Sequence, residues 1–292
     1  GLMEKKYKPF FKWSGGKSKE LPIVHKYKPK EFNTYHEPFI GGGAAWLNLN
    51  HSKNVVSDNF AELVEFYNII KEYKQEAIDY INKIALEYNS VDKDNLTKDE
   101  FNEVGNKYYY HYRNNEFTEP LDKALKFYML RQLSFSGMLR FNAKGEFNIP
   151  FGWYKNVKVL NYNDELFKLL DNTDIKLGDW KSGLTDVTED DFVFFDPPYT
   201  RKFQSYSPYG VFGEKEHIEL SEWFKSSPSK NMLILNKDEF THSLYKDYIV
   251  DEYDYKYSIQ YRDRMKKEDS NSIHFVALNY KKPIRDIDKF IK

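Results

Sequence analysis

The 292-residue chain contains no cysteine, which excludes disulfide bonds, zinc sites with thiolate ligands and a cysteine nucleophile. It also lacks any run of about 18 apolar residues, so the sequence predicts no membrane-spanning helix. The seven histidines are scattered, and no spacing of His, Asp or Glu is typical of a metal site. From these absences we expect no metal, no membrane contact and a cytoplasmic location.

The net charge of −1 gives no overall sign of a nucleic-acid-binding protein, but the basic residues are unevenly placed. Residues 131–158 contain five basic side chains and one acidic side chain, and residues 256–267 repeat these numbers. Local basic segments in a nearly neutral protein favour a nucleic-acid-binding face. The predicted contacts with nucleic acid from these segments include Lys144, Lys155, Arg262 and Arg264.

Predicted strands and helices alternate at both ends of the chain, which indicates a Rossmann-like α/β domain. The predicted strands are residues 34–39, 54–57, 175–178, 192–195 and 232–235, followed by an antiparallel pair at 253–260 and 272–280. Helical spacing of apolar residues predicts helices from residue 44 and over 61–88, 121–133 and 215–225.

The middle of the chain lacks this alternation. Helical periodicity prevails after residue 61, and residues 134–162 form a basic, aromatic segment that contains glycine. We therefore predict an inserted, mainly helical domain over residues 61–160. The remaining residues, 1–60 and 161–292, are predicted to form one discontinuous α/β domain.

Three acidic residues follow predicted strands. Asp58, Asp179 and Asp196 each stand where an apolar segment ends. Ligands bind outside the carboxyl ends of strands in an open parallel sheet, and an acid after the second strand typically binds ribose hydroxyls. We therefore predict Asp58 as the ribose ligand and Asp179 as a contact to the adenine edge of the same ligand. The alternative for each acid is an N-cap of the following helix.

The segment Val193-Phe-Phe-Asp-Pro-Pro-Tyr199 is the most informative in the chain. Pro197 and Pro198 fix φ and cannot donate ladder hydrogen bonds, so the strand must end where Asp196 is presented. The carboxylate, a fixed backbone carbonyl and the flat ring of Tyr199 together predict a site for a planar base that carries an exocyclic amine.

Two glycine-rich loops precede these motifs. Glycines in Glu37-Pro-Phe-Ile-Gly-Gly-Gly43 permit a close backbone approach to a ligand. The loop Ser14-Gly-Gly-Lys-Ser18 invites an alternative interpretation as a phosphate-binding P-loop. That motif requires glycine at position 11, which is Phe11, and an apolar strand before it, so the sequence disfavours a nucleotide triphosphatase.

Several of these motifs resemble, in order, those of the DNA adenine methyltransferase (Dam) family. These enzymes carry their target-recognition domain before the Asp-Pro-Pro-Tyr motif. The similar segments span roughly residues 8–283 and are Phe11–Lys17, Glu37–Gly43, Ser57–Asn59, Gly137–Gly152, Asp196–Tyr199 and Ala277–Tyr280.

The resemblance implies a Rossmann-like methyltransferase fold with a mainly helical recognition insert, and S-adenosyl-L-methionine as cofactor with S-adenosyl-L-homocysteine as product. It implies that Asp196 and the Pro197 carbonyl accept hydrogen bonds from the amino group of a flipped adenine, on which Tyr199 stacks. The residues that it implies for the cofactor site are Trp13, Lys17, Glu37, Phe39, Gly41, Asp58, Asp179 and Asp196.

The same resemblance implies contacts to double-stranded DNA from the middle of the chain. Arg140 and Asn142 would contact DNA, and Met138 occupies a position that can wedge into the duplex. Ser136 stands where GATC-specific members carry Asn, and Trp153 replaces a basic residue. The target is therefore GATC or a relaxed or different short site, with Ser136 and Trp153 as further candidate DNA contacts.

Several alternatives stay open at the level of sequence. The acid and the carbonyl do not determine which base is methylated, so cytosine N4 or RNA adenine is an alternative methyl acceptor. A non-catalytic DNA-binding homologue is an alternative to an enzyme. A separate restriction endonuclease is an open partner, and a monomer or weak dimer is expected. The sequence does not distinguish a bacterial origin from a phage or virus.

Overall fold

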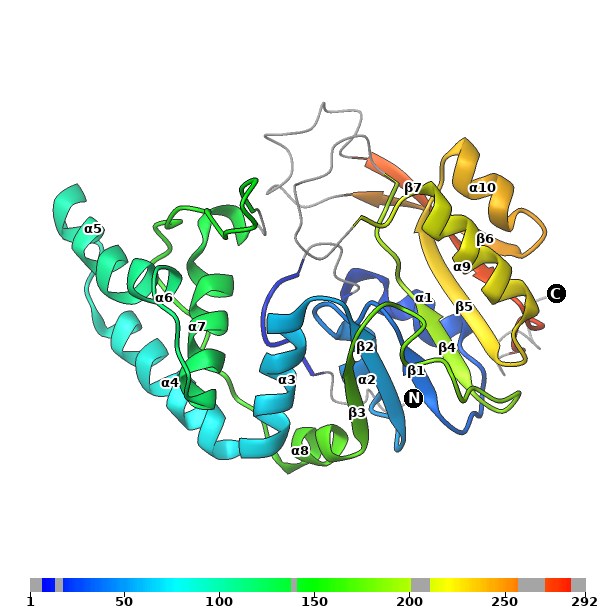
Figure 1. Cartoon of the computed structure of the whole chain (residues 1–292), viewed down its shortest axis with the longest axis horizontal. Helices are drawn as coiled ribbons and strands as arrows, with labels where there is room; N and C mark the ends of the chain where they lie inside the picture. The colour runs from blue at the N-terminus through cyan, green and yellow to red at the C-terminus, as the bar shows by residue number, and fades with distance from the viewer. Residues whose placement is uncertain (1–6, 14–17, 138–140, 201–210, 257–270, 285–292) are drawn as a thin grey trace.

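The computed structural model describes residues 7–13, 18–137, 141–200, 211–256 and 271–284. Its centre is a seven-stranded sheet with the order β3-β2-β1-β4-β5-β7-β6 (Figure 1). The strands are β1 (Tyr35–Glu37), β2 (Asn54–Asp58), β3 (Thr173–Leu177), β4 (Phe192–Phe195), β5 (Lys230–Asn236), β6 (Ile249–Lys256) and β7 (Asn271–Leu278).

The first five strands are parallel, and β7 lies antiparallel between β5 and β6. This arrangement confirms the predicted Rossmann-like α/β fold and the antiparallel pair. The predicted positions 257–260 of that pair lie outside the described residues. Between β1 and β4 the strand order reverses direction, which is the point where open α/β sheets bind ligands.

Side chains of successive strand residues alternate between the two faces of the sheet. In β4, Phe192 and Phe194 belong to one buried cluster, whereas Val193 and Phe195 belong to the other. The first cluster takes in residues of α1 (Leu21–Tyr27), α2 (Ala44–Leu49) and α3 (Ala61–Tyr73), and the second takes in residues of α9 (Glu214–Ser226) and α10 (Glu239–Tyr245). The sheet is therefore covered by helices on both faces, as its fully apolar central strand requires.

The middle of the chain is largely helical and stands beyond α3, on the β3 side of the sheet (Figure 1). Its elements are α4 (Gln75–Ser90), α5 (Lys98–Gly105), a π-helix at Asn106–Tyr110, α6 (His111–Arg113) and α7 (Pro120–Leu133), and α8 (Asp164–Asp171) follows. Helix α3 contacts β2 and β3 as well as α4 and α7. Because α3 touches both parts, the predicted junction near residue 61 remains a prediction.

The predicted helical region 61–88 is divided between α3 and α4. Lys74 between them has a positive φ of 52°, which a continuous right-handed helix does not allow. Helix α5 was not predicted, although Thr97 and Glu100 form a capping box at its start. This capping box is a sequence pattern from which the start of α5 could have been predicted.

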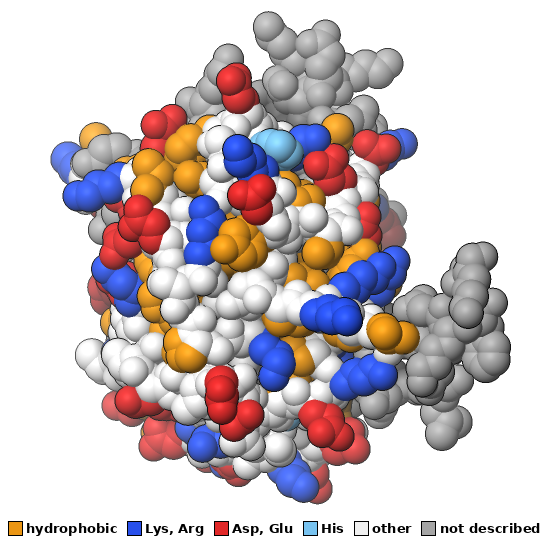
Figure 2. Space-filling model, turned by 90° about the vertical axis from the view of Figure 1, so that its right-hand side faces the viewer, with side chains coloured by type: hydrophobic (Ala, Val, Ile, Leu, Met, Phe, Trp, Pro, Cys, Tyr) orange, Lys and Arg blue, Asp and Glu red, His pale blue; other side chains and the backbone are white. Residues whose placement is uncertain are grey.

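The side of the molecule that carries α9 and α10 has a mixed surface. Figure 2 shows Lys and Arg side chains interspersed with Asp and Glu side chains over this face. Such a surface lacks the single-sign field that draws a protein onto a nucleic acid. In the described part of the chain, no helix is long and apolar enough to span a membrane.

Candidate active site at the carboxyl edge of the sheet

The predicted site residues converge at one edge of the sheet. Glu37 ends β1, Asp58 ends β2, and Asp196 directly follows β4. Strand β1 pairs with both β2 and β4 in parallel, so the three carboxyl ends lie at the same edge. The sequence prediction that strand ends bring these acids together agrees with this topology.

The loop after β1 has an unusual backbone. Phe39, Gly41 and Gly43 all have positive φ, of 61°, 49° and 74°. The amide of Gly41 donates to Asp58 Oδ2 at 3.1 Å, and the hydroxyl of Tyr67 on α3 donates to the Gly41 carbonyl at 2.7 Å. A non-glycine residue at positive φ is uncommon, and such strain is retained where the surroundings enforce it.

Trp13 packs directly against this loop. A Cβ added to Gly41 would lie 2.8 Å from Trp13 Cδ1, and one added to Gly42 would lie 3.0 Å from Trp13 Cβ. The first distance is too short for a real Cβ, so any larger residue at position 41 would displace the indole. We call Gly41, Asp58 and the residues around them the cradle. Trp13 lies at this cradle, where the resemblance implies a contact with the cofactor.

Asp58 is oriented by backbone amides. Its Oδ1 accepts from the Phe60 amide at 3.0 Å, and its Oδ2 accepts from Gly41. Burial raises the pKa of the Asp58 carboxyl, and the hydrogen bonds from the amides of Gly41, Phe60 and Asn59 oppose this rise. Because each carboxylate oxygen has two acceptor sites, Asp58 retains capacity for ligand hydroxyls.

Asp196 lies close to two other polar groups of β1. The buried Tyr35 hydroxyl donates to Glu37 Oε1. Burial raises the pKa of Tyr35 well above its ordinary value, and the negative charges of Glu37 and Asp196 raise it further. Tyr35 therefore stays a neutral donor, and it stands beside two carboxylates at the reversal point of the sheet.

The backbone after the prolines is clamped from β5 and α10. The Thr200 amide donates to Asn236 Oδ1 at 3.3 Å, and Asn236 Nδ2 donates to Thr200 Oγ1 at 3.2 Å. The Thr200 hydroxyl donates to Asp238, the N-cap of α10. Three side-chain contacts on one residue hold the end of the Asp-Pro-Pro-Tyr segment in place.

A buried histidine and two half-buried phenylalanine rings pack close to the same segment. His217 on α9 is fully buried, and its ring lies 4.7 Å from that of Phe212 in a perpendicular arrangement. Phe212 in turn packs against Phe39, at 5.2 Å. Burial lowers the pKa of His217, while the nearby Pro198 carbonyl opposes this shift, so the imidazole is neutral at pH 7.

Asp179 is placed less tightly than the other two acids. It is exposed, and its Oδ1 accepts from the Lys181 amide at 3.0 Å and from Ser182 Oγ at 3.3 Å. These bonds cap a turn, not the start of a helix as in the alternative that the sequence left open. The Gly178 amide donates to the Asp58 carbonyl at 3.0 Å, so the turn nevertheless begins at the edge that carries Asp58.

The predicted DNA contacts fall into three groups. Asn142 Oδ1 accepts from the amides of Lys144 and Glu146, and Lys144 is exposed at this turn. Trp153, with φ of 62°, packs on Phe101 at 5.2 Å, and Lys155 forms an ion pair with Asp94. The remaining predicted DNA contacts lie outside the described residues: Met138, Arg140, Arg262, Arg264 and the side chain of Ser136; the cofactor candidate Lys17 lies outside them as well.

Two basic residues counted in the segment 131–158 do not face solvent as the charge count assumed. Arg131 is 5% exposed and donates to the carbonyls of Lys12 and Gly137, with its guanidinium 5.1 Å from the Trp13 ring. Lys158 donates to the Pro9 carbonyl at 2.7 Å, and burial lowers its pKa. Both tie the middle of the chain to the N-terminal loop, so the basic face is smaller than the sequence suggests.

Sequence reasoning missed several residues at this edge. Tyr67 counted only as an apolar helix position, and Tyr35, Thr200, Asn236 and His217 were not singled out. Tyr67, Thr200 and Asn236 have polar groups whose partners are distant in sequence, which no local pattern reveals. Phe135 was also missed; it is 48% exposed and lies two residues before the stretch Gly137–Gly152 that resembles the recognition segment.

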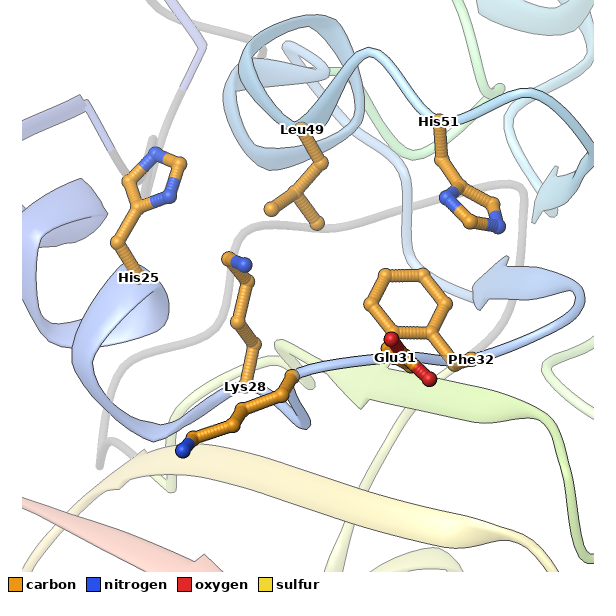
Figure 3. Close-up of a pocket in the computed structure, with 7 residues that line it drawn as sticks. His25, Lys28, Glu31, Phe32, Leu49 and His51 are labelled. Atoms are coloured by element: carbon orange, nitrogen blue, oxygen red, sulfur yellow. The ribbon is translucent and has the colours of Figure 1, made fainter. Parts of the chain in front are cut away.

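One cavity stands apart from these residues. It has a volume of about 550 Å³ and is lined by residues that include His25, Lys28, Phe32 and His51 (Figure 3). Phe32 and His51 precede β1 and β2, so the cavity lies at the amino ends of these strands, opposite Asp58 and Asp196. We therefore do not assign the site to it. Among the described residues, no three His, Asp or Glu side chains gather closely enough to hold a metal ion.

Comparison with known proteins bears on this edge directly. Residues 13–265 match the model of the D12 class N6 adenine-specific DNA methyltransferase family. The chain is 34% identical to the type II methyltransferase M.CviBI of Paramecium bursaria Chlorella virus NC1A, over 94% of this chain and 100% of the relative. It is 31% identical to the type II methyltransferase M1.LlaDCHI of Lactococcus lactis subsp. cremoris, over 83% and 86%. It is 28% identical to a DNA adenine methylase of Haemophilus influenzae, over 82% and 83%.

Proposed function

Because the chain belongs to the D12 class N6 adenine-specific DNA methyltransferase family and is thus a DNA adenine-N6 methyltransferase, we propose that its reaction centre is the edge between β1 and β4. The observation that carries this proposal is the placement of Asp196. The carboxylate directly follows a fully buried strand, with the buried Pro197 after it and the ring of Tyr199 beyond. These are the groups that a flipped adenine requires.

The proposed chemistry follows from the amine. The lone pair of the exocyclic nitrogen is delocalised into the adenine ring, so the nitrogen is a weak nucleophile. The Asp196 carboxylate and the Pro197 carbonyl each accept one of its two hydrogens, which pulls the nitrogen toward tetrahedral geometry and localises the lone pair. Fixed acceptors at a developing charge need no reorganisation during the reaction. The clamp on Thr200 supports this role, because it limits movement of the segment.

We propose that S-adenosyl-L-methionine, which supplies an electrophilic methyl group when it is bound, occupies the cradle of Gly41 and Asp58. The residues fit a nucleoside: Asp58 offers carboxylate oxygens for ribose hydroxyls, and the missing Cβ of Gly41 lets Trp13 pack beside them. Trp13 and Phe39 line the cradle, and Glu37 adds negative charge beside a cationic sulfonium. We also assign Lys17 to this site, and Asp179 to the adenine edge.

We propose that residues 61–160 form the target-recognition part and that residues 1–60 and 161–292 form the catalytic part. The exposed Lys144 and Phe135 support a role for the insert in contacting double-stranded DNA. Ser136, Met138, Arg140, Asn142, Trp153 and Lys155, with Arg262 and Arg264 from the C-terminal segment, complete the proposed DNA contacts. Tyr199 would stack on the flipped base and Met138 would fill the vacated position.

The family match favours DNA adenine over the alternatives of cytosine N4 and RNA adenine. The two type II relatives support a place in a restriction–modification system with a separate endonuclease, in the cytoplasm of a bacterium or of a virus-infected cell. Ser136 and Trp153 support a target that differs from GATC or is more relaxed.

Methylation of unmodified genomic DNA by the purified protein tests this proposal. We expect N6-methyladenine at one short sequence after mapping by single-molecule sequencing, and no product without S-adenosyl-L-methionine. A digest with N4-methylcytosine in place of methyladenine would contradict the assignment. Methylation confined to GATC would exclude the proposed departure from that target, while leaving the chemistry in place.

A further inference from the structure

A buried pair of polar side chains lies behind the ring of Tyr199. His274 on β7 is 0% exposed, and Glu20, which precedes α1, is 2% exposed. His274 Nδ1 lies 3.2 Å from Glu20 Oε2, and the Tyr253 hydroxyl donates to the same oxygen. Burying such groups costs free energy even when they are paired, so the pair is weak evidence for stability alone.

The imidazole of His274 is surrounded by tyrosines. Tyr255 stacks on it, with ring centroids 4.4 Å apart and planes at 14°. Tyr199 meets it edge-on at 5.1 Å and 62°, and Tyr253 does so at 5.8 Å and 68°. Perpendicular contacts of this kind fix the orientation of a ring. The contact with His274 therefore restricts the side-chain torsions of Tyr199.

The backbone alone does not fix the orientation of the Tyr199 ring. The two prolines and the Thr200 clamp fix the main chain on either side of Tyr199. They leave the side-chain torsions of Tyr199 free, and ordering them costs conformational entropy when a base binds. The His274 ring contacts Tyr199 directly and is therefore in a position to orient it.

We propose that His274, held by Glu20 and covered by Tyr255, is a positioning residue that sets the ring of Tyr199 before the adenine arrives. This inference rests on the proposed stacking role of Tyr199. The pair also joins the start of α1, which follows the N-terminal loop, to β7 at the other end of the chain. Removal of His274 should therefore act through Tyr199 and leave the Gly41 cradle unaffected.

A double-mutant cycle tests this coupling. We expect His274→Ala to lower kcat about tenfold and the 2-aminopurine signal of a flipped target base, with KM for S-adenosyl-L-methionine within about twofold. In a Tyr199→Ala background the same change should cost almost nothing further, because the ring it positions is absent. Losses that multiply would overturn the proposal and leave a purely structural role.

A matched control separates positioning from stability. Asn279 lies just past the other end of β7 and bonds the Asn231 amide at 2.6 Å and the Ser229 carbonyl at 2.9 Å. Asn279→Ala should lower the melting temperature without a change in kcat or in the 2-aminopurine signal. If His274→Ala does not fold, Tyr255→Ala removes the half-buried covering ring, and it should lower kcat in the same Tyr199-dependent manner.

The outcomes also distinguish this inference from the proposed function. If Tyr199→Ala itself leaves kcat and base flipping unchanged, the stacking role fails. If Tyr199→Ala slows methylation while His274→Ala and Tyr255→Ala do not, stacking stands and the positioning role is overturned.

Discussion

The site has two sides that are held together differently. We call the surroundings of Gly41 and Asp58 the nucleoside side, and the surroundings of Asp196 and Tyr199 the base side. The Gly41–Asp58 hydrogen bond spans 17 positions in sequence, and the Tyr67–Gly41 bond spans 26. On the base side, the Thr200–Asn236 bond spans 36 positions, and the pair behind Tyr199 spans 254.

This difference separates binding from chemistry in physical terms. The nucleoside side uses backbone amides and glycine φ angles, which one stretch of chain supplies by itself. The base side must orient a carboxylate, a carbonyl and a ring against a substrate that is extruded from a duplex. We therefore expect variants on the nucleoside side to change KM for the cofactor and variants on the base side to change kcat.

Asp196→Ala should give the largest effect and tests the base side directly. We expect at least about a 10³-fold loss of kcat, because one of the two acceptors for the amine is removed. Cofactor affinity and DNA affinity should change little, as judged by equilibrium titration. Asp196→Asn keeps an acceptor oxygen without the charge, so its kcat should lie between those of the unchanged protein and Asp196→Ala.

The matched control for this variant is Asp186→Ala, an exposed acid in the loop before β4. It should leave methylation unchanged. Near-normal turnover in Asp196→Ala would contradict the proposed mechanism, and a parallel loss of cofactor binding would contradict the separation of the two sides.

Asp58→Asn should have an intermediate effect, on the nucleoside side. Hydrogen bonds to a charged group contribute about 1.5–3 kcal/mol, so we expect KM for S-adenosyl-L-methionine to rise about 10- to 100-fold. Initial-rate kinetics at saturating DNA measure this, and kcat should stay within about threefold.

Asp179→Asn is the comparison on the same side, because the proposed contact to the adenine edge comes from an exposed carboxylate that already caps its own turn. We expect a change in KM of about twofold for this variant. If the two variants weaken binding equally, the ribose role no longer belongs to Asp58 alone. If Asp58→Asn lowers kcat as much as it raises KM, the two sides are not separable.

The same difference decides how much the sequence could predict. The fold and the convergence of Asp58 and Asp196 followed from apolar strands with acids at their ends. The cradle followed from three adjacent glycines, because one stretch of chain contains the whole signal. The support from His274, Asn236 and Asp238 could not be predicted, since it depends on which strand end β7 reaches in three dimensions.

Charge and periodicity patterns failed for a related reason. Arg131 and Lys158 belong to a basic segment, yet their side chains turn inward to carbonyls of the N-terminal loop. The pattern over residues 61–88 predicts a helical region, and only the backbone at Lys74 shows the break within it. A count of residue types along the sequence does not show which way a side chain points. It therefore cannot distinguish a basic residue on the surface from one that turns inward to bind backbone carbonyls.

The pH dependence should give the smallest effect and sharpen the comparison. Burial raises the pKa of Asp58 above its ordinary value of 3.8. As pH falls toward this raised pKa, the carboxyl gains a proton and loses its charge, so cofactor binding weakens. Burial lowers the pKa of His217 on the base side, so the protonation of this ring is shifted toward more acidic pH. We expect KM for the cofactor to rise as the pH is lowered from 7.5 to 5.

The control is Asp58→Asn, which carries no titrating group at this position and should show a flat KM over the same range. Kinetics of both proteins at constant ionic strength provide the comparison, after the folded fraction at each pH has been checked by circular dichroism. An equal rise in KM for both proteins would place the titrating group elsewhere. A rise in KM on raising the pH would contradict the sign of the effect, because a raised carboxyl pKa can weaken ribose binding only toward acid.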